Sequence, residues 1–255
     1  MTDSRKVLVT GASSGIGKAS ALFFAREGHS LWLTYSTNRV QAEEVATECR
    51  AAGAPDVHVS GLDLGSPDAI TALAAEVTSA WGDLHVLVNN GGVSPYTSPD
   101  DITLTEWDQV MNVNARSVFL MTQAFLPLLR AAGTNAAGVD RSIVNVSSAA
   151  GSYGSATTGL HYSASKGAVL SITRSYALML APERIRVNAI TPGPIFSVMS
   201  DKLTGPARTK MEATIPLGSF GKPEDAAWII GSLASPGAAF VTGATYDVNG
   251  GTRIS

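Results

Sequence analysis

Cysteine is nearly absent from this chain of 255 residues: Cys49 stands alone, so no disulfide can form within the chain. A reducing, cytoplasmic setting is therefore the default prediction. Charge of one sign is also lacking, because 18 Lys and Arg residues face 21 Asp and Glu residues, the net charge is −3, and the basic residues are scattered. This composition offers no basic surface for nucleic acid. No metal site is predicted either.

Long apolar runs are missing as well. The sequence holds no stretch of about 18 apolar residues and no basic segment followed by an apolar one at its start. We therefore predict neither a membrane span nor a secretory signal. The hydrophobic content of 45% is ordinary for a packed globular core. Because α/β chains of this length commonly form one unit, residues 1–255 are predicted to be a single domain.

Short apolar runs alternate with longer helical patterns along the chain. The runs predict strands at residues 6–10, 31–33, 57–59, 84–88, 142–146, 185–190 and 246–248. Strands that alternate with helices imply right-handed crossovers and a parallel sheet covered by helices on both faces. The predicted fold class is therefore α/β, a doubly wound parallel sheet of about seven strands.

Capping residues and prolines mark several predicted helix boundaries. Ser66 is expected to cap a helix over residues 67–81, and Thr105 is expected to cap a long helical stretch that continues through Leu129. Two segments are expected to lie largely outside regular structure: a surface loop at 133–140 and an irregular or weakly helical stretch at 194–217.

The first predicted strand runs directly into a glycine-rich turn. Gly11, Gly15 and Gly17 lie between this strand and the helical pattern of residues 19–27. Glycines let the backbone turn tightly and approach a pyrophosphate, while free N–H groups and the helix dipole face the anion. Glycines can also merely close a loop, but their place between a strand and a helix favours a dinucleotide phosphate site.

Polar and glycine-rich segments gather at the predicted carboxyl ends of the strands. In a doubly wound sheet, ligands bind at these ends. The segments that fall there are residues 11–17, residues 89–92, Ser148 and Pro192-Gly193. Their convergence predicts one ligand cleft, and this prediction does not depend on any single motif.

Tyr162 and Lys166 are four residues apart in a segment whose alanine, serine and leucine content allows a helix. Residues at i and i+4 share one helix face, so the phenol and the ammonium can meet the same ligand. A nearby cation lowers the pKa of tyrosine from its usual value of about 10, so Tyr162 is expected to exchange a proton near neutral pH. Ser148, at the end of a predicted strand, is placed to hold a substrate oxygen. A Tyr and Lys pair at this spacing also arises by chance on many helices.

With these pieces in order, the chain resembles the compact single-domain branch of the short-chain dehydrogenase/reductase family over essentially its whole length. The resemblance rests on Thr10-Gly11-x-x-x-Gly15-x-Gly17, Asn89-Asn90-x-Gly92, Asn114, Ser148, Tyr162-x-x-x-Lys166 and Pro192-Gly193. It implies a Rossmann-like fold. It also implies an NAD(P)-dependent oxidoreductase that transfers a hydride between nicotinamide and a carbonyl or alcohol substrate, such as a 3-oxoacyl thioester or another ketone.

The resemblance implies catalytic roles for four residues. Tyr162 is the implied general acid and base, and Ser148 polarises and positions the carbonyl. Lys166 holds the nicotinamide ribose and lowers the pKa of Tyr162. Asn114 supports a water-borne proton path to Lys166, and a buried amide that braces a helix bend is the alternative role for this residue.

Two adjacent serines compete for the role at the carbonyl. Ser148 is preferred because Gly151 follows it by three residues, which is the spacing that the family shows. Ser147 is expected to face the other side of the strand.

The implied cofactor site has an adenosine end and a nicotinamide end. Asp63 is assigned to the adenine amino group. In the alternative, Asp63 is only a loop residue that caps a turn. Asn90 is assigned to the adenosine ribose region, and the Ile195 backbone to the carboxamide. The full set of predicted cofactor-binding residues is Gly11, Ser13, Ser14, Gly15, Ile16, Gly17, Tyr35, Ser36, Thr37, Arg39, Asp63, Leu64, Asn90, Gly91, Gly92, Tyr162, Lys166, Pro192, Gly193 and Ile195.

The end of the second predicted strand bears on which nicotinamide cofactor binds. The position that matches the family's discriminating acid is Tyr35, followed by Ser36, Thr37, Asn38 and Arg39. A carboxylate there would bind an unmodified ribose diol and repel a 2′-phosphate. No acid is present and Arg39 can pair with phosphate, so NADP(H) is predicted in preference to NAD(H). In the alternative, Arg39 is a solvated residue that opens the next helix.

The segment 194–217 is expected to be a substrate lid. Its apolar side chains favour an apolar or mixed substrate, although any amphipathic helix needs such residues for packing. His161, beside Tyr162, is equally well a surface histidine. The candidate substrate contacts are Ser94, Tyr96, Tyr153, His161, Phe196 and Met199.

Two rival functions remain for such a chain. One is a non-catalytic NADP-binding regulator or scaffold of the same fold, against which the complete Ser, Tyr, Lys and Asn set argues. The other is an enoyl reductase, which the resemblance disfavours because Tyr162 and Lys166 are separated by only three residues. Small residues around Lys166 allow close approach of a second helix, and the family usually pairs this helix between subunits. A homotetramer is therefore predicted, with a dimer as the alternative.

Overall fold

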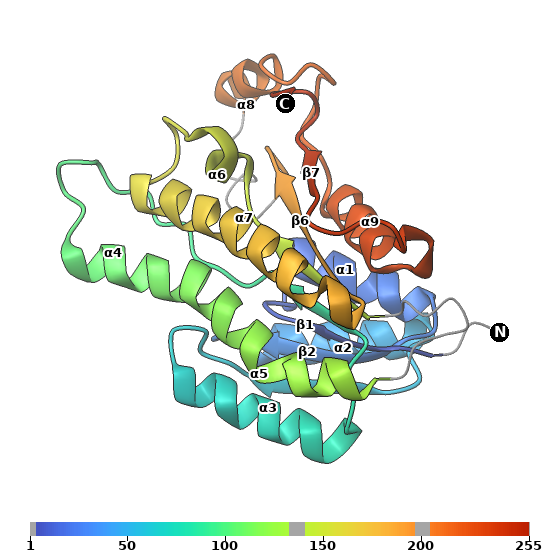
Figure 1. Ribbon diagram of the computed structural model, residues 1–255. Helices are drawn as coiled ribbons and strands as arrows, with labels where there is room; N and C mark the ends of the chain where they lie inside the picture. The colour runs from blue at the N-terminus through green and yellow to red at the C-terminus, as the bar shows by residue number, and fades with distance from the viewer. Residues whose placement is uncertain (1–3, 133–140, 197–204, 255) are drawn as a thin grey trace.

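A parallel sheet forms the centre of the molecule in the computed structural model, which describes residues 4–132, 141–196 and 205–254 (Figure 1). Within these residues the strand order is β3-β2-β1-β4-β5-β6-β7, and every neighbouring pair is parallel. The order reverses between β1 and β4, which is the switch point of a doubly wound sheet. The strands are β1 (Lys6–Val9), β2 (Ser30–Tyr35), β3 (Val57–Gly61), β4 (Val86–Asn89), β5 (Arg141–Val146), β6 (Ile185–Pro192) and β7 (Thr245–Val248).

Helices cover both faces of the sheet, and successive strand residues point alternately to each face. Val7 and Val9 pack in one core with α1 (Gly15–Arg26), α2 (Arg39–Ala52) and α9 (Pro223–Ala234). Leu8 packs in the other core with α3 (Pro67–Trp81), α5 (Ser117–Ala131) and α7 (Leu160–Leu180). The predicted α/β fold with a doubly wound parallel sheet is therefore confirmed.

One long helical rod crosses the edge of the cleft and contains a local irregularity. It consists of α4 (Leu104–Met111), a π-helical turn η1 (Asn112–Arg116) and α5. The prediction that Thr105 caps this rod is wrong. Thr103 is the N-cap, because its Oγ1 accepts a 3.2 Å hydrogen bond from the N–H of Glu106. An N-cap side chain accepts from the N–H two or three residues further on, and Thr105 already lies within the first turn of α4.

The remaining described elements are short helices in the second half of the chain. They are α6 (Ala149–Tyr153), α8 (Gly205–Glu212), and the short 3-10 helices η2 (Ala181–Glu183) and η4 (Pro236–Ala238). The predicted surface loop at 133–140 lies outside the described residues, as does part of the predicted lid. Among the helices that the structure describes, none is both long and apolar enough to cross a membrane.

Candidate active site

A cleft runs along the carboxyl ends of the strands and consists of two adjoining cavities. The first, of about 360 Å³, is lined by residues that include Ser148, Tyr162 and Lys166. The second, of about 420 Å³, extends from the glycine turn to the ends of β2 and β3. Asn90 and Gly92 line both cavities. The cleft lies where the sequence predicted it, because parallel strands all end at the same edge of the sheet.

The glycine turn between β1 and α1 is shaped for close approach of a ligand. Gly11 has a φ of +64°, and a Cβ on Gly17 would lie only 2.2 Å from the Gly11 carbonyl oxygen. Asn90 fixes the turn, since its Nδ2 donates to the carbonyl oxygens of Thr10 and Gly11 at 2.9 and 3.1 Å. The N-cap of α1, Ser14, makes no side-chain capping bond, which leaves the helix N–H groups available. This backbone cradle fits the pyrophosphate of a dinucleotide.

The two serines at the end of β5 occupy different environments. Ser147 is buried, and its Oγ donates a 2.8 Å hydrogen bond to the Lys166 carbonyl oxygen. Ser148 lines the first cavity and caps α6, its Oγ accepting from the Ala150 N–H at 3.1 Å. Both serines line the first cavity, but the Ser147 hydroxyl is engaged with the backbone of α7, whereas the Ser148 hydroxyl lies beside Tyr162.

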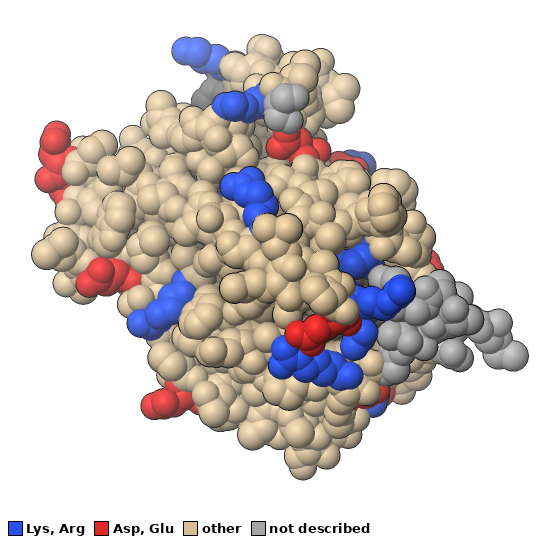
Figure 2. All heavy atoms as spheres, viewed as in Figure 1, with Lys and Arg blue, Asp and Glu red and all other residues tan. Residues whose placement is uncertain are grey.

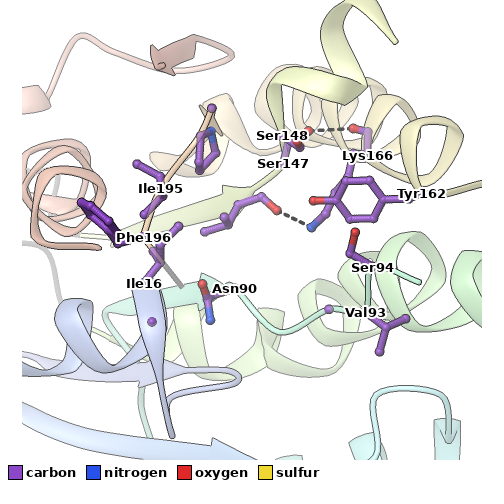
Figure 3. A pocket seen from close by; sticks show the side chains of 15 residues that line it. Ile16, Asn90, Val93, Ser94, Ser147, Ser148, Tyr162, Lys166, Ile195 and Phe196 are labelled. Carbon is purple, nitrogen blue, oxygen red and sulfur yellow. Dashed lines mark hydrogen bonds between the residues drawn. The ribbon is translucent and has the colours of Figure 1, made fainter. Parts of the chain in front are cut away.

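Tyr162 and Lys166 project from one face of α7 into the first cavity. In Figure 3 they lie with Ser94 on one side of the pocket, and Ile16, Ile195 and Phe196 lie on the other. The Lys166 ammonium is 5.9 Å from the centre of the Tyr162 ring, and it donates a 2.8 Å hydrogen bond to the Val146 carbonyl oxygen. One turn of helix therefore places both polar groups beside Ser148.

Burial dominates the electrostatics of this pair. It lowers the pKa of Lys166 from 10.5 to about 8, because a low-polarity environment disfavours the charged form. Burial also raises the pKa of Tyr162, and the Ser148 hydroxyl acts in the opposite direction. The pKa of Tyr162 therefore lies above its usual value in the protein alone, and not below it as the sequence predicted. The reason is that loss of hydration around the phenol outweighs its polar neighbours.

Gly151 is a structural requirement of the site whose role the sequence indicated only through its spacing from Ser148. A Cβ at this position would lie 2.5 Å from the Lys166 carbonyl carbon and 2.8 Å from the Gly167 nitrogen. The backbone of α6 therefore lies directly on the backbone of α7. Only glycine permits this approach, and it sets the distance between Ser148 and the helix that carries Lys166.

Asn114 lies in the π-helical turn η1 and is fully buried. Its Oδ1 accepts from the Val93 N–H at 2.8 Å, and its Nδ2 donates to the Val93 carbonyl oxygen at 2.8 Å and to Ser165 Oγ at 3.0 Å. The amide thus joins the rod, the loop after β4 and α7. A Cβ on Gly92 would lie 2.9 Å from Asn114 Oδ1 and 3.5 Å from Lys166 Nζ, so both side chains converge beside Gly92. Turns of π-helix of this kind often occur at functional sites.

The second cavity contains most of the residues predicted for the adenosine end. Asp63 lines it, and one carboxylate oxygen also accepts from the Gly65 N–H at 2.8 Å. Arg39 does not line the cavity: its side chain is 74% exposed, and its Nε lies 3.7 Å from Glu43. Asn38 lines the cavity instead and caps α2. The polar run after β2 could have identified Asn38. The predicted residues that line this cavity are Gly11, Ser13, Ser14, Tyr35, Ser36, Thr37, Asp63, Leu64, Asn90, Gly91 and Gly92.

The predicted residues near the nicotinamide end and the substrate separate into two groups. Ser94 and Phe196 line the first cavity, together with Gly15, Ile16, Pro192, Gly193 and Ile195. The side chains of Tyr96 and Tyr153 are exposed and do not line it. Tyr153 instead carries the Arg253 guanidinium 4.5 Å above its ring. Met199 lies outside the described residues.

Both interpretations of His161 are wrong. Its side chain is 0% exposed, so it is not a surface histidine, and it does not line the cavity. Its Nε2 lies 3.1 Å from Glu106 Oε1. Helix periodicity explains the difference, because α7 turns residues 161 and 162 by about 100° relative to each other and only the second faces the cleft.

Comparison with known proteins finds similarity over nearly the whole chain. A family model described as enoyl-(acyl carrier protein) reductase matches residues 11–253. The 3-oxoacyl-[acyl-carrier-protein] reductase FabG of Thermotoga maritima is 37% identical over 253 residues, which are 99% of this chain and 99% of that protein.

Solved structures give the same result. The Pseudomonas aeruginosa RhlG/NADP active-site complex superimposes with a TM-score of 0.91 at 31% identity, over 98% of this chain and 96% of that one. A double mutant of a Serratia marcescens short-chain dehydrogenase/reductase gives a TM-score of 0.87 at 29% identity over 97% of each chain. The chain therefore belongs to the short-chain dehydrogenase/reductase family and is an NAD(P)-dependent oxidoreductase, as the sequence predicted.

Proposed function

We propose that this enzyme reduces the ketone of a 3-oxoacyl thioester or a similar carbonyl compound with NADPH, and that Ser148, Tyr162, Lys166 and Asn114 form its catalytic set. The observation that supports this most directly is that Ser148, Tyr162 and Lys166 line one cavity next to the glycine cradle. Asn114 is fixed against the loop that borders the same cavity.

The proposed mechanism assigns one task to each residue. The nicotinamide, when bound, supplies or accepts the hydride. The hydroxyl groups of Ser148 and Tyr162 donate hydrogen bonds to the substrate carbonyl oxygen, which holds the carbonyl in place and stabilises the negative charge that develops on it. Tyr162 then gives its proton to that oxygen. Lys166 stabilises the resulting phenolate when protonated, and Asn114 keeps the cavity wall in register.

NADP(H) is the proposed cofactor. The part of the second cavity at the end of β2 is lined by Ser36, Thr37 and Asn38, and none of these side chains is acidic. Hydroxyl and amide groups can donate to a 2′-phosphate, whereas a carboxylate would repel it. The solved structure of RhlG contains NADP. The Arg39 side chain does not contribute to this lining, so the neutral polar side chains carry the proposal.

Ketone reduction is preferred over enoyl reduction as the substrate chemistry. The matching family model is described as an enoyl reductase, whereas the curated relatives from Thermotoga maritima and Staphylococcus aureus are 3-oxoacyl reductases. In this chain Ser148 and Tyr162 both line the cavity. Two hydroxyl donors directed at one oxygen suit a carbonyl, and the short Tyr162 to Lys166 interval favours the same reaction.

A substrate screen tests the proposal. NADPH oxidation is measured by its ultraviolet absorbance with ketones, aldehydes, 3-oxoacyl thioesters and enoyl thioesters. Turnover of a ketone or 3-oxoacyl substrate, with little turnover of the enoyl thioester, is the expected result. Turnover of the enoyl thioester alone would replace ketone reduction with enoyl reduction. NADPH binding without turnover of any substrate would favour the non-catalytic regulator.

A homotetramer is the proposed assembly, with a dimer as the alternative. Helices α5 and α7 present the exposed apolar side chains Phe119, Leu178 and Met179, and α9 presents Trp228. The middle of the face formed by α4, α5 and α7 carries few charged side chains (Figure 2). Exposed apolar surface of this kind is typical of subunit contacts. Light scattering tests this assembly, and a monomer at micromolar concentration would contradict it.

Two further assignments complete the proposal. One domain is proposed for the whole chain, because helices from both halves of the sequence pack on a single sheet. A cytoplasmic location is proposed because the chain has a single cysteine, Cys49, and therefore forms no internal disulfide.

A further inference from the structure

His161 is a buried titratable residue that the proposed mechanism does not use. It directly precedes Tyr162 in the first turn of α7, and its ring is fully shielded from solvent. Its Nε2 lies 3.1 Å from Glu106 Oε1 on α4. Because a carboxylate only accepts hydrogen bonds, Nε2 carries the hydrogen and donates it to Glu106. The side chain therefore joins the helix of Tyr162 to the start of α4.

Glu106 continues this connection to the loop that follows β4. The same Oε1 atom accepts a 2.5 Å hydrogen bond from Thr97 Oγ1. That bond and the interaction with His161 hold the pKa of Glu106 below its usual value, so the carboxylate stays charged. The Thr103 cap also fixes the Glu106 backbone. One carboxylate oxygen thus links Thr97 to His161.

The loop 93–97 is held at both of its ends. The amide oxygen and the amide nitrogen of Asn114 both bind the backbone of Val93, and Glu106 accepts a hydrogen bond from the Thr97 side chain. Between these two attachments lies Ser94, which lines the first cavity together with Tyr162. The position of this part of the cavity wall relative to Tyr162 therefore depends on the Thr97–Glu106–His161 connection.

Close packing shows that the connection is built into the start of α7. A Cβ on Gly159, the N-cap residue of α7, would lie 2.4 Å from His161 Cε1 and 2.9 Å from the Pro95 carbonyl oxygen. The imidazole ring, the helix start and the loop backbone thus meet at one point. His161 Nδ1 has no hydrogen-bond partner among the described residues. An unpaired buried polar atom destabilises the folded state. The bond from His161 Nε2 to Glu106 is therefore the hydrogen bond that the imidazole ring makes at this position.

We propose that Thr97, Glu106 and His161 form a clamp that positions the substrate-side loop 93–97 against the helix that carries Tyr162. The three side chains act as positioning residues: they do not touch the reacting atoms, but they fix the wall of the carbonyl pocket. The inference rests on the proposed carbonyl reduction at that pocket. It predicts that breaking the clamp impairs use of the carbonyl substrate and leaves the nucleotide cradle, which lies on the other side of Asn90, unaffected.

The clamp is tested with the variants Thr97→Val, Glu106→Ala and Glu106→Gln. Thr97→Val keeps the side-chain shape but removes the hydroxyl, and Glu106→Gln keeps an oxygen that can accept from both partners. His58→Gln is a control for loss of a histidine–carboxylate pair elsewhere, because His58 Nε2, on β3, lies 2.9 Å from Asp56 Oδ2 and neither residue lines the cleft.

Steady-state kinetics with a ketone substrate and NADPH-binding titrations provide the first readout. Glu106→Ala and Thr97→Val are each expected to lower kcat/KM for the ketone by about tenfold or more, mainly through KM, while the Kd for NADPH changes less than about twofold. Glu106→Gln should recover most of the loss. His58→Gln should leave both constants unchanged even if it lowers Tm by a similar amount. Wild-type kinetics in Glu106→Ala, or equal losses of ketone and NADPH affinity in step with Tm, would overturn the proposal.

Hydrogen exchange provides a second readout that does not require activity. The amides of Val93, Ser94, Tyr96 and Thr97 are expected to exchange faster in Glu106→Ala and Thr97→Val than in the wild type, while those of β5 stay unchanged. Unchanged exchange at 93–97 would overturn the clamp even if the enzyme reduces ketones. Faster exchange in a protein that reduces no carbonyl would support the clamp and reject the proposed function.

Discussion

Lys166 Nζ donates its 2.8 Å hydrogen bond to the carbonyl oxygen of Val146, the last residue of β5. The cation of the site is therefore held by the sheet itself, two residues before Ser148. Because this ammonium is buried and forms no ion pair with an acidic side chain in the described part of the chain, its charge opposes folding until a ligand or a change of pH relieves the cost. Lys166, which supplies the positive charge of the site, therefore lowers the free energy of unfolding by a measurable amount.

The first prediction concerns this penalty. Burial lowers the pKa of Lys166 from 10.5 to about 8, so the folded state binds the proton less tightly than the unfolded state. The penalty is full below about pH 8 and fades as the pH rises toward 10.5. The free energy of unfolding of the wild type, relative to Lys166→Met, should therefore rise by about 2 to 3 kcal/mol between pH 7 and pH 10.

Urea unfolding of both proteins at several pH values measures this difference. Other groups that titrate in the same range cancel between the two proteins, because they are common to both. A difference that stays constant from pH 7 to pH 10 would show that Lys166 is not held in a desolvated state.

A second prediction tests the proton donor. Tyr162→Phe should lower kcat for ketone reduction by about 10²- to 10⁴-fold, because the phenyl ring keeps the packing but has no proton to give. The Kd for NADPH, measured by fluorescence titration, should change less than about twofold. Tyr153→Phe is the control, since Tyr153 is a tyrosine outside the cavity, and it should keep wild-type activity. Substantial turnover by Tyr162→Phe would remove Tyr162 from the mechanism.

A third prediction concerns the choice of cofactor. Ser36→Asp places a carboxylate in the cavity at the end of β2, where it should repel the 2′-phosphate and raise the KM for NADPH by at least about tenfold relative to that for NADH. Ser36→Asn has the same size without the charge and should keep the NADPH preference. Arg39→Ala should change either KM less than about threefold, because the Arg39 side chain is largely exposed. A large loss in Arg39→Ala would return the phosphate-binding role to that residue.

A fourth prediction concerns the contact between α6 and α7. Gly151→Ala should lower the free energy of unfolding by about 1 to 3 kcal/mol, because the added Cβ meets the Lys166 backbone at 2.5 Å. It should also reduce kcat, since Ser148 lies at the start of α6. Thermal melts and steady-state assays measure both effects. Gly237→Ala is the matched control, as its added Cβ would make only an ordinary 3.4 Å contact, and equal behaviour of the two variants would refute the argument.

Much of the fold follows from the sequence because it depends on local pattern. Apolar runs separated by helical patterns predicted the parallel sheet, and Ser66 before Pro67 predicted the start of α3, where Ser66 Oγ accepts from the Ala69 N–H at 3.2 Å. The start of the long rod was predicted two residues too late, at Thr105, because residue type alone does not show which side chain accepts the capping hydrogen bond. The hydrogen bond from the Glu106 N–H selects Thr103.

The site residues that failed did so for reasons that residue type does not reveal. Tyr96 and Tyr153 are aromatic residues near the cleft in sequence, but their side chains turn outward. Arg39 has the right charge, but it opens α2 and lies near Glu43. The direction in which a side chain points depends on its position around the helix and on the conformation of the loops. Both are determined by contacts with residues that are distant in sequence.

By itself, the sequence determined the family, the glycine turn and the alternation of strands and helices in a parallel sheet, because these are properties of motif and spacing. Only the tertiary structure decided which of those groups are desolvated and which face one another. Burial raises the pKa of Tyr162, and His161 is paired with Glu106 rather than exposed. Both outcomes depend on the polarity and packing of the surroundings, which arise only when segments far apart in the chain come together.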